Sequence, residues 1–403
     1  MQIKLPAPVL TAINLLNHAG YEAFVVGGSI RNALLHLPIY DYDMTTSATP
    51  NEMKEVFKDY KIIETGIKHG TLTIHIDHFA LEITTYRIES EYLDHRHPSA
   101  VSFSRNLKDD LERRDFTINA FAYHPTLGIV DYFNGHEDLN NHIIRAINNP
   151  LIRFDEDALR IMRAIRFSST LNFTIESNTA KAIHDSKDLL LSISKERIHD
   201  ELIKLIVGDN VYQILIEYQD ILELIIPELL TINDYSSNVS ILANSIKDIN
   251  IRIAILLHSL DINLAKDVLK QLKFSNKDSK AILTLIANYH NQLTTNRIEL
   301  KKILFKLDKE LTYQLLDLQY ADSSNNITSE VYHSIKDILD YIITKQECFT
   351  IKALAINGND VISLGINPTN ITTILNACLK EVIEERIDNT KNNLLEYITH
   401  NFN

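Results

Sequence analysis

The chain has 403 residues, of which 45% are hydrophobic and 23% charged, with only 10 glycines and 9 prolines. These proportions are typical of a globular protein with more than one domain, and they exclude a collagen-like, low-complexity or disordered chain. The formal net charge of -13 argues against a protein that coats nucleic acid non-specifically, although a local basic groove can still bind phosphates.

Targeting signals and cysteines narrow the class further. No segment approaches eighteen consecutive uncharged apolar residues, so we expect no membrane span and no membrane partner. The first twenty residues have the spacing of an amphipathic helix and not the apolar core of a signal peptide, so we expect a cytoplasmic protein. Cys348 and Cys378 lack the spacing of zinc ligands or of a disulfide framework.

The hydrophobic pattern changes near residue 150. Before it, short β-type runs alternate with helices. These runs lie at 23–26, 70–76, 79–88 and 100–104. After it, apolar residues recur at i, i+3 and i+4, which predicts helices. The clearest of them lie at 153–167, 195–208 and 210–226. The pattern predicts an α+β region followed by an all-α region, with internal breaks at 231–240 and 321–330.

The first candidate site is a strand-to-helix turn at Gly27, Gly28 and Ser29. Glycines in such a turn let backbone N–H groups and a helix N-terminus approach a phosphate, with Arg31 as a counter-charge. A pair of glycines alone is more often only a turn. The acidic residues that follow this turn favour the phosphate-binding interpretation.

Asp41 and Asp43 follow the turn by about a dozen residues. At i and i+2 on one strand, their carboxylates would point to the same face and converge on one or two Mg²⁺ ions. An Asp-x-Asp pair alone is commonly a solvated strand end, but with the preceding turn it favours phosphoryl or nucleotidyl transfer. Glu82 is a candidate third carboxylate, and an outward-facing strand glutamate explains it equally well.

The segment 110–123 places Arg113 and Arg114 beside Asp115, with Asn119 four residues later. In the functional interpretation, Arg114 contacts a triphosphate and Asp115 and Asn119 reach a ribose hydroxyl. The alternative is a structural ion pair, and the sequence does not separate the two.

The segment 153–167 reads as one helix that begins with acidic residues and carries Arg160, Arg163 and Arg166 as a ridge. The helix dipole would explain acids at a helix start, including Asp155 and Glu156. A partner helix or RNA phosphates would suit the ridge. Alternatively, Asp157 and Arg160 together offer an acceptor beside a donor, which matches cytosine and adenine and excludes uracil and guanine.

With these motifs in place, the chain resembles the CCA-adding enzymes, the tRNA nucleotidyltransferases of the DNA polymerase beta-like superfamily, in their Bacillus and Staphylococcus form. The motifs are VVGGSIRNALL…DYDMTTSATP, RRDFTINA, EDALRIMRAIRF and SKERIHDELIKLI. The resemblance implies an α+β nucleotidyltransferase head followed by an all-α neck, body and tail. The implied domains are a catalytic head at 1–149, a base-recognising neck at 150–211, a body at 212–325 and a tail that contacts the tRNA elbow at 326–403.

The resemblance also implies an activity, which is template-independent addition of C, C and A to the 3′ end of tRNA from CTP and ATP. Mg²⁺ would be held by the two catalytic aspartates, and pyrophosphate would leave. By the same resemblance, the metal-binding residues are Asp41 and Asp43, and the nucleotide-binding residues are Gly28, Ser29, Arg31, Arg114, Asp115, Asn119, Asp157, Arg160, Arg163 and Arg166. A poly(A) polymerase, an enzyme adding only CC or only A, and a non-catalytic tRNA-binding protein are the alternatives.

Some segments depart from the family pattern or extend it. Asn32 stands where the family usually has aspartate, which removes a negative charge beside the phosphate turn. Residues 89–103 resemble the head-domain loop associated with adding the final A. In the tail, Thr369, Asn370 and Thr372 replace glycines, so close approach to a tRNA elbow is less secure there. The sequence leaves open whether the chain forms a homodimer.

Overall fold

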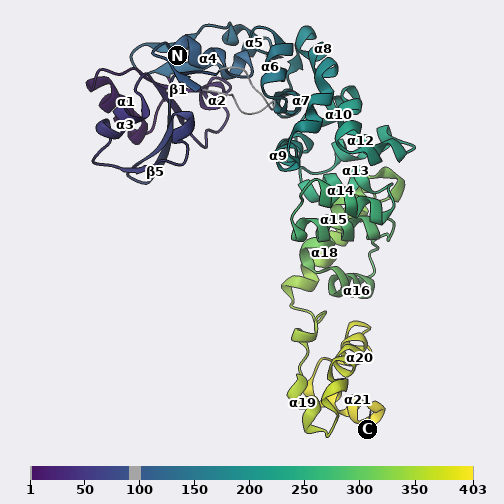
Figure 1. Ribbon diagram of the computed structural model, residues 1–403. Coiled ribbons are helices and arrows are strands. Elements are labelled where there is room, and N and C mark those ends of the chain that lie inside the picture. The colour runs from purple at the N-terminus through teal and green to yellow at the C-terminus, as the bar shows by residue number, and fades with distance from the viewer. Residues whose placement is uncertain (1, 90–100, 403) are drawn as a thin grey trace. The chain divides into compact units, whose positions relative to one another are not determined.

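The computed structural model describes residues 2–89 and 101–402, and the chain divides into two compact units, Met1–Pro227 and Glu228–Asn403. All the strands lie in the first unit, and the described part of the second consists of helices and turns (Figure 1). The predicted order, an α+β region followed by helices, is confirmed. No helix within the described residues is long and apolar enough to cross a membrane.

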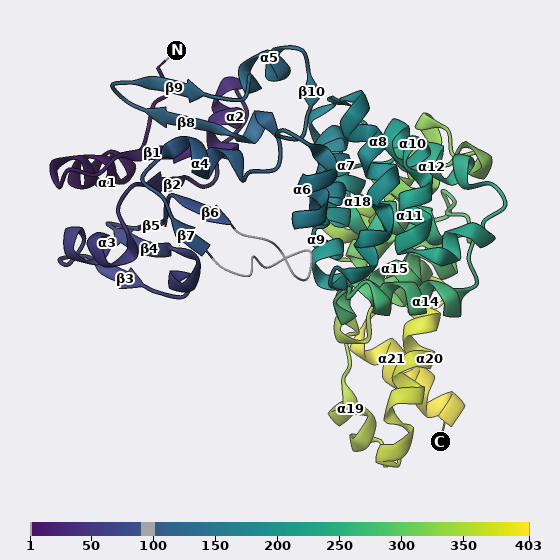
Figure 2. The same cartoon turned by 45° about the horizontal axis from the view of Figure 1, so that its top comes forward.

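A seven-stranded mixed sheet organises the first unit. Its order is β3-β4-β5-β2-β1-β8-β9, so β3 and β9 form opposite edges (Figure 2). The strands are β1 Ala23–Val26, β2 Asp43–Thr46, β3 Lys61–Ile63, β4 Thr71–Ile76, β5 Phe79–Thr85, β8 Phe121–His124 and β9 Gly128–Asp131. Only β2 and β5 run parallel. β1 is buried along its whole length, which explains its continuous apolar run.

The predicted strand at 79–88 is interrupted. Tyr86 is fully buried and separates β5 from β6 Arg87–Glu89, which leaves the large sheet and pairs with β7 Val101–Phe103. The loop predicted to take part in adding the final A, residues 89–103, falls mostly outside the described residues.

Helices surround the sheet and continue beyond it. The helices of the first unit are α1 Ala7–His18, α2 Gly28–Leu34, α3 Pro50–Val56, α4 Leu107–Glu112, α5 Gly135–Asn140, α6 Pro150–Glu156, α7 Leu159–Leu171, α8 Ser177–Ser186, α9 Lys195–Ile206, α10 Val211–Glu217 and α11 Gln219–Ile225. A short parallel pair, β10 Ile143–Ile144 and β11 Thr174–Ile175, joins the segment after the sheet to the helices. The helix α7 packs on α9; α7 carries Arg160, Arg163 and Arg166, and α9 carries Arg197.

The second unit contains ten helices among its described residues. They are α12 Tyr235–Asn244, α13 Ile249–Leu257, α14 Ile262–Gln271, α15 Asn276–Asn288, α16 Arg297–Leu307, α17 Lys309–Ala321, α18 Ser329–Thr344, α19 Gly358–Ser363, α20 Ile371–Ile383 and α21 Lys391–Phe402. One core cluster lies among the last of these helices and includes Cys348 and Cys378, both of which are free thiols.

Candidate active site

The first part of the site is the turn between β1 and α2. Gly27 has a φ of +77°, which residues with side chains rarely adopt, and a Cβ there would lie 3.0 Å from Nη1 of Arg114. The backbone N–H of Gly27 donates to the carbonyl of Phe121 on β8 at 3.2 Å. The hydroxyl of buried Ser29 donates to the carbonyl of Val26 at 3.1 Å. The sheet therefore fixes the turn and brings bare backbone close to an arginine, which suits an anion.

The two aspartates lie beside this turn, but they do not share a strand. β2 begins at Asp43 and Asp41 precedes it, so the prediction that both belong to one strand is wrong for Asp41. Asp43 lies in register with Glu82 on the neighbouring strand β5. Partial loss of water and the like charges of Asp41 and Glu82 raise the pKa of Asp43, although Arg114 opposes the shift. Carboxylates that repel one another favour a bound cation.

Glu82, the candidate third carboxylate, is exposed and does not line the pocket that the two aspartates share. Across residues 2–89 and 101–402, no group of three or more Asp, Glu, His or Cys side chains is arranged to hold a metal ion. Asp41 and Asp43 could therefore hold a metal ion only if substrate oxygens or water completed its coordination, as is usual for Mg²⁺.

Arg113 and Arg114 share one buried carboxylate, that of Asp110. This carboxylate accepts hydrogen bonds from Nε and Nη2 of Arg113 at 2.9 and 2.8 Å, and from Nη2 of Arg114 at 3.5 Å. Burial would raise the pKa of Asp110, but the two guanidinium groups and the Thr45 hydroxyl hold it below its usual value. Both arginines form an ion pair with Asp110, and the one made by Arg113 is the closer, at 2.8 Å against 3.5 Å.

Arg114 has a hydrogen-bond donor that the described residues leave unused. Its Nε is buried and has no hydrogen-bond partner in the described part of the chain. Burial and the nearby charge of Arg113 lower its pKa. A buried guanidinium with an unused donor gains most from a charged acceptor, so Arg114 is suited to bind phosphate.

Asp115 is buried and fully engaged. One of its oxygens accepts from Nδ2 of Asn119 at 3.0 Å and from the N–H of Phe116 at 2.8 Å. The other accepts from Nε and Nη2 of Arg163 at 2.8 and 2.6 Å. Burial would raise the pKa of Asp115, but Arg163 and Asn119 hold it well below its usual range. These four bonds fill the acceptor sites of a carboxylate, so Asp115 positions Arg163 and Asn119.

Asn119 in turn bridges to the phosphate turn. Its Oδ1 accepts from Nη1 of Arg31 at 2.6 Å. Burial, together with the positive charges of Arg166 and Arg163, lowers the pKa of Arg31 to about 10, although Asp115 opposes the shift. Asn32 retains an acceptor beside this arginine, because its Oδ1 accepts from Nε and Nη2 of Arg31 at 3.2 and 2.8 Å. Compared with the aspartate usual in the family, Asn32 lacks only the negative charge.

The segment 153–167 is two helices and not one. α6 ends at Glu156 and α7 begins at Leu159, with Asp157 extended between them at φ −140° and ψ 101°. Asp155 and Glu156 therefore lie in the last turn of a helix, where the dipole disfavours acids, and the dipole explanation is wrong. Asp157 caps α7, because its Oδ1 accepts from the N–H of Leu159 at 3.2 Å. Competition between this short polar side chain and the backbone accounts for the break.

Asp157 and Arg160 line the same pocket, and the N–H of Arg160 donates to the carbonyl of Asp157 at 2.9 Å, but their side chains bond to other groups. Oδ2 of Asp157 accepts from Nη2 of Arg197 on α9 at 3.0 Å. Arg160 is buried and donates to Glu156 at 2.7 Å and to the backbone carbonyls of Arg153 and Arg113 at 3.1 and 2.7 Å. Three of its five N–H donors are used in this way, which leaves two for a ligand.

Arg163 and Arg166 gather around a buried aromatic ring. The guanidinium carbons of Arg31, Arg163 and Arg166 lie 4.8, 5.4 and 3.5 Å from the ring centroid of Phe167. Nε of Arg166 also donates to Oε2 of the buried Glu201 at 2.8 Å. Cation–π contacts of this kind hold guanidinium groups in place without neutralising their charge.

The pocket has a volume of about 470 Å³, and all twelve residues that the family resemblance assigned to metal or nucleotide binding line it, whereas Glu82 does not. Gly27, Arg113 and Phe167 complete its lining. Sequence reasoning did not assign roles to Asp110, Phe167, Arg197 and Glu201. Asp110 had a local signal, because it stands three and four residues before the two arginines, whereas Arg197 and Glu201 reach the site only through the packing of α9 on α7.

Comparison with known proteins places the chain in a family. A model described as "Poly A polymerase head domain" matches residues 23–145, one described as "Probable RNA and SrmB- binding site of polymerase A" matches 172–232, and one for tRNA nucleotidyltransferase domain 2 matches 245–398. The CCA-adding enzyme of Ligilactobacillus salivarius is 38% identical to the chain, over 98% of the chain and 96% of that protein. The chain belongs to the CCA-adding enzymes.

Two further comparisons agree with this membership. The CCA-adding enzyme of Lactobacillus helveticus is 50% identical to the chain over 222 residues. This match covers 54% of the chain and 55% of that relative. The crystal structure of the Bacillus stearothermophilus CCA-adding enzyme in complex with CTP matches with a TM-score of 0.81 and 28% identity, over 98% of each chain. The family and fold that the motifs implied are confirmed, whereas the residue roles stay predictions.

Proposed function

We propose that the chain adds C, C and A to the 3′ end of tRNA without a nucleic-acid template, using CTP and ATP and releasing pyrophosphate. The observation that carries the proposal is the single pocket in which two aspartates face a group of arginines beside a glycine turn. A carboxylate pair beside a polyphosphate-binding surface is what nucleotidyl transfer needs. Membership of the CCA-adding enzymes supports tRNA as the acceptor of the transferred nucleotide.

We propose that Asp41 and Asp43 hold Mg²⁺. Their oxygen ligands suit this ion, and the pKa of Asp43 is raised mainly by burial and also by the negative charges of Asp41 and Glu82, which a cation would neutralise. When bound, Mg²⁺ supplies a Lewis acid that activates the tRNA 3′-hydroxyl and neutralises charge on the triphosphate. The remaining steps rest on the side chains and backbone of the chain itself.

The arginines are proposed to bind and orient the triphosphate. Arg114 and Arg31 flank the turn at Gly27, and Arg163 and Arg166 face the same pocket from α7. The pocket therefore brings four guanidinium groups together with the two aspartates. Arginines that hold the triphosphate in one orientation would present its α-phosphorus to the tRNA 3′-hydroxyl for in-line attack.

Asp157 and Arg160 are proposed to read the base. Each has hydrogen-bonding capacity left after its protein contacts, because Arg160 retains two donors and each Asp157 oxygen accepts one hydrogen bond. An acceptor beside a donor complements the amino group and ring nitrogen of cytosine or adenine. Uracil and guanine would leave buried polar groups unpaired.

Product analysis on a trimmed tRNA tests the function. A tRNA that lacks its last three nucleotides is incubated with each labelled nucleotide and Mg²⁺, and product length is measured. We expect two additions with CTP alone and a third that requires ATP. An open-ended ladder with ATP would indicate a poly(A) polymerase, and an arrest after CC, or addition of A alone, would indicate a partial enzyme. Retention of tRNA affinity without Mg²⁺-CTP binding would indicate a non-catalytic tRNA-binding protein.

The larger organisation is likewise a proposal. We propose four domains: a head at 1–149, a neck at 150–211, a body at 212–325 and a tail at 326–403. A cytoplasmic location follows from the proposed substrate, since tRNA is processed there in bacteria.

A further inference from the structure

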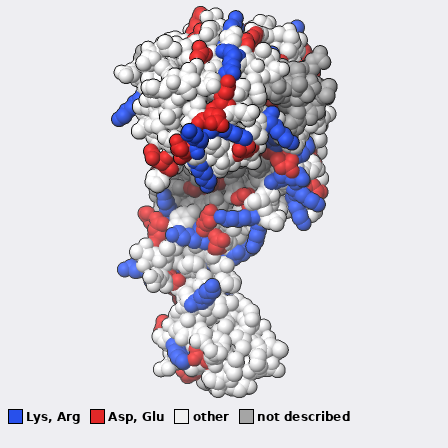
Figure 3. Space-filling view, turned by 60° about the vertical axis from the view of Figure 1, so that its left-hand side comes forward, with Lys and Arg blue, Asp and Glu red and all other residues white. Residues whose placement is uncertain are grey.

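Arg31 differs from the other five arginines that line the active-site pocket in the groups that hold it. Each of those five forms an ion pair with a carboxylate, from 2.6 Å for Arg163 with Asp115 to 3.5 Å for Arg114 with Asp110. Arg31 forms no ion pair with any residue that the structure describes. The chain has 53 acidic residues, which are interspersed with basic ones on the face shown in Figure 3, so carboxylates are not scarce.

Two neutral amide oxygens hold Arg31 instead. Oδ1 of Asn32 accepts from Nε and Nη2 of Arg31 at 3.2 and 2.8 Å, and Oδ1 of Asn119 accepts from Nη1 at 2.6 Å. The guanidinium group is buried, and its carbon lies 4.8 Å from the ring centroid of Phe167. Three of its five N–H donors are used, and the remaining two, one on each Nη, can bind an anion.

The amide of Asn32 has only one orientation that satisfies its neighbours. Its Nδ2 donates to the carbonyl of Pro38 at 3.0 Å, in the loop that leads to Asp41. A carbonyl can only accept and a guanidinium can only donate, so the amide oxygen must face Arg31 and the NH₂ group must face Pro38. An aspartate in this position would place a carboxylate oxygen against that carbonyl and would add a negative charge beside Arg31.

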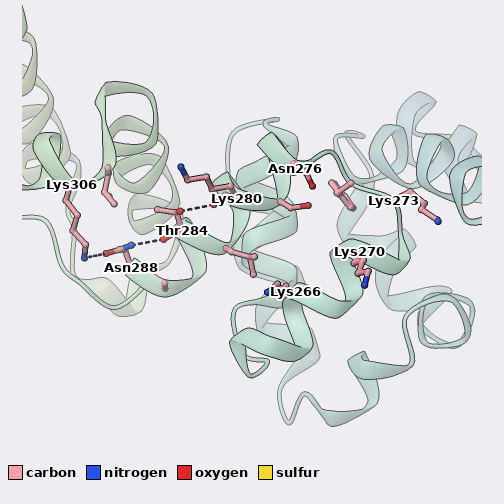
Figure 4. Close-up of a pocket in the computed structure, with 13 residues that line it drawn as sticks. Lys266, Lys270, Lys273, Asn276, Lys280, Thr284, Asn288 and Lys306 are labelled. Carbon is pink, nitrogen blue, oxygen red and sulfur yellow. Dashed lines mark hydrogen bonds between the residues drawn. The ribbon is translucent and has the colours of Figure 1, made fainter.

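The chain uses the same arrangement at a second place. In the second unit, Oδ1 of Asn288 accepts from Nζ of Lys306 at 3.0 Å, while its Nδ2 donates to the carbonyl of Thr284 at 2.7 Å (Figure 4). Here too an asparagine joins a cation to a backbone carbonyl through a neutral amide. Asn288 does not line the active-site pocket, so it offers a matched control for substitutions of Asn32.

We propose that Asn32 is a positioning residue for nucleotide binding, which orients Arg31 through a neutral oxygen and so leaves its positive charge for the triphosphate. The inference rests on the proposed function, in which Arg31 binds the triphosphate of CTP or ATP. The other five arginines each contact a carboxylate that offsets part of their charge, whereas Arg31 does not. The aspartate usual in the family would pair with Arg31 and compete with the triphosphate for it.

The test compares three variants of the full chain with the wild type. Asn32→Asp keeps an oxygen beside Arg31, but it adds a charge and loses the donor to Pro38. Asn32→Ala loses the same donor without adding a charge. Asn288→Asp makes the same change of charge beside Lys306, outside the pocket. The dissociation constants of Mg²⁺-CTP and of cytidine, the nucleoside without phosphates, are measured without tRNA, and thermal unfolding checks that each variant is folded.

We expect Asn32→Asp to raise the dissociation constant of Mg²⁺-CTP about tenfold, because a carboxylate in contact with Arg31 opposes the binding of a polyanion. Cytidine should bind the wild type and this variant equally, because it carries no phosphate. Asn32→Ala should weaken CTP binding less than Asn32→Asp does, and Asn288→Asp should leave it unchanged.

Three results would overturn the proposal. The first is an unchanged affinity of Asn32→Asp for CTP. The second is an equal loss of affinity for CTP and cytidine, which would indicate a disturbed pocket. The third is an equal loss of CTP affinity in the two variants of Asn32, which would assign the effect to the bond with Pro38. The proposed function fails separately, because a wild type that binds CTP but adds nothing to a trimmed tRNA would refute it, while the variants would still decide the role of Asn32.

Discussion

The substitution Asp157→Asn tests base reading directly. Both carboxylate oxygens of Asp157 accept hydrogen bonds, one from the N–H of Leu159 at 3.2 Å and the other from Arg197 at 3.0 Å. An amide has only one acceptor oxygen, so the asparagine NH₂ must face a donor in either orientation. The charged partner is the stronger one, and we expect the amide oxygen to stay on Arg197.

The magnitudes follow from these two contacts. Loss of the Leu159 bond, which caps α7, should cost about 0.5 to 1.5 kcal/mol of stability. The larger effect falls on the nucleotide, because an NH₂ group now meets the exocyclic amino group of cytosine or adenine. A paired base contact contributes about 1 to 3 kcal/mol of discrimination, so preference for CTP over UTP should fall by about 5- to 150-fold.

The assay is the ratio of kcat/KM for CTP and UTP on a trimmed tRNA, with Asp155→Asn as the control. Asp155 is an exposed acid two residues away that does not line the pocket, so the control makes the same charge change without altering the site. Equal loss of rate with both nucleotides, at an unchanged ratio, would refute the reasoning and assign Asp157 a positioning role alone.

Three further predictions concern the metal, the arginines and the fold. Because the pKa of Asp43 is raised, the ionised carboxylate lowers the free energy of unfolding near neutral pH, and this loss disappears as the pH falls below the usual pKa of an aspartate. Asp43→Asn should therefore raise the melting temperature without metal and abolish nucleotide addition. Mg²⁺ should raise the melting temperature of the wild type only. Phe167→Leu should raise the KM for CTP about tenfold, because three guanidinium groups each lose a cation–π contact of about 0.5 kcal/mol or more. The control is Phe154→Leu, at a buried ring that does not line the pocket, and an equal rise in its KM would contradict this reasoning. Gly208→Ala should destabilise the first unit by about 1 to 3 kcal/mol, measured by thermal unfolding, because its Cβ would overlap the backbone of Ser169; an unchanged melting temperature would show that the two segments can separate at little cost.

The residues of the candidate site were accessible to sequence reasoning because their chemistry is carried by compact motifs. The turn at Gly27 and the acids at 41 and 43 lie within one short segment, and the arginines follow a helical spacing. What the sequence did not predict depends on distant contacts. Arg197 meets Asp157 across forty residues, and Glu201 meets Arg166 across thirty-five. The order of the sheet was likewise out of reach, because β2 pairs with β5 and β1 pairs with β8, and both pairings join strands that are not consecutive in the sequence.

The break at Asp157 shows a different limit. Hydrophobic periodicity continues from Phe154 through Ile165, so the pattern predicts one helix across a position where the backbone is extended. A side chain that caps from within an apolar repeat does not disturb the repeat itself. The pattern therefore predicts a helix start at the acidic cluster 155–157, whereas α7 begins two residues later, at Leu159.

That break has a consequence for anyone who engineers this protein. Ala at 157 would remove the cap but favour a continuous helix, since alanine has the highest helix propensity. A design that rewards helix propensity alone would therefore be drawn to the residue on which nucleotide choice is proposed to depend. Helix propensity and fidelity would be selected in opposite directions at one position, so libraries that vary residue 157 need a screen for product sequence.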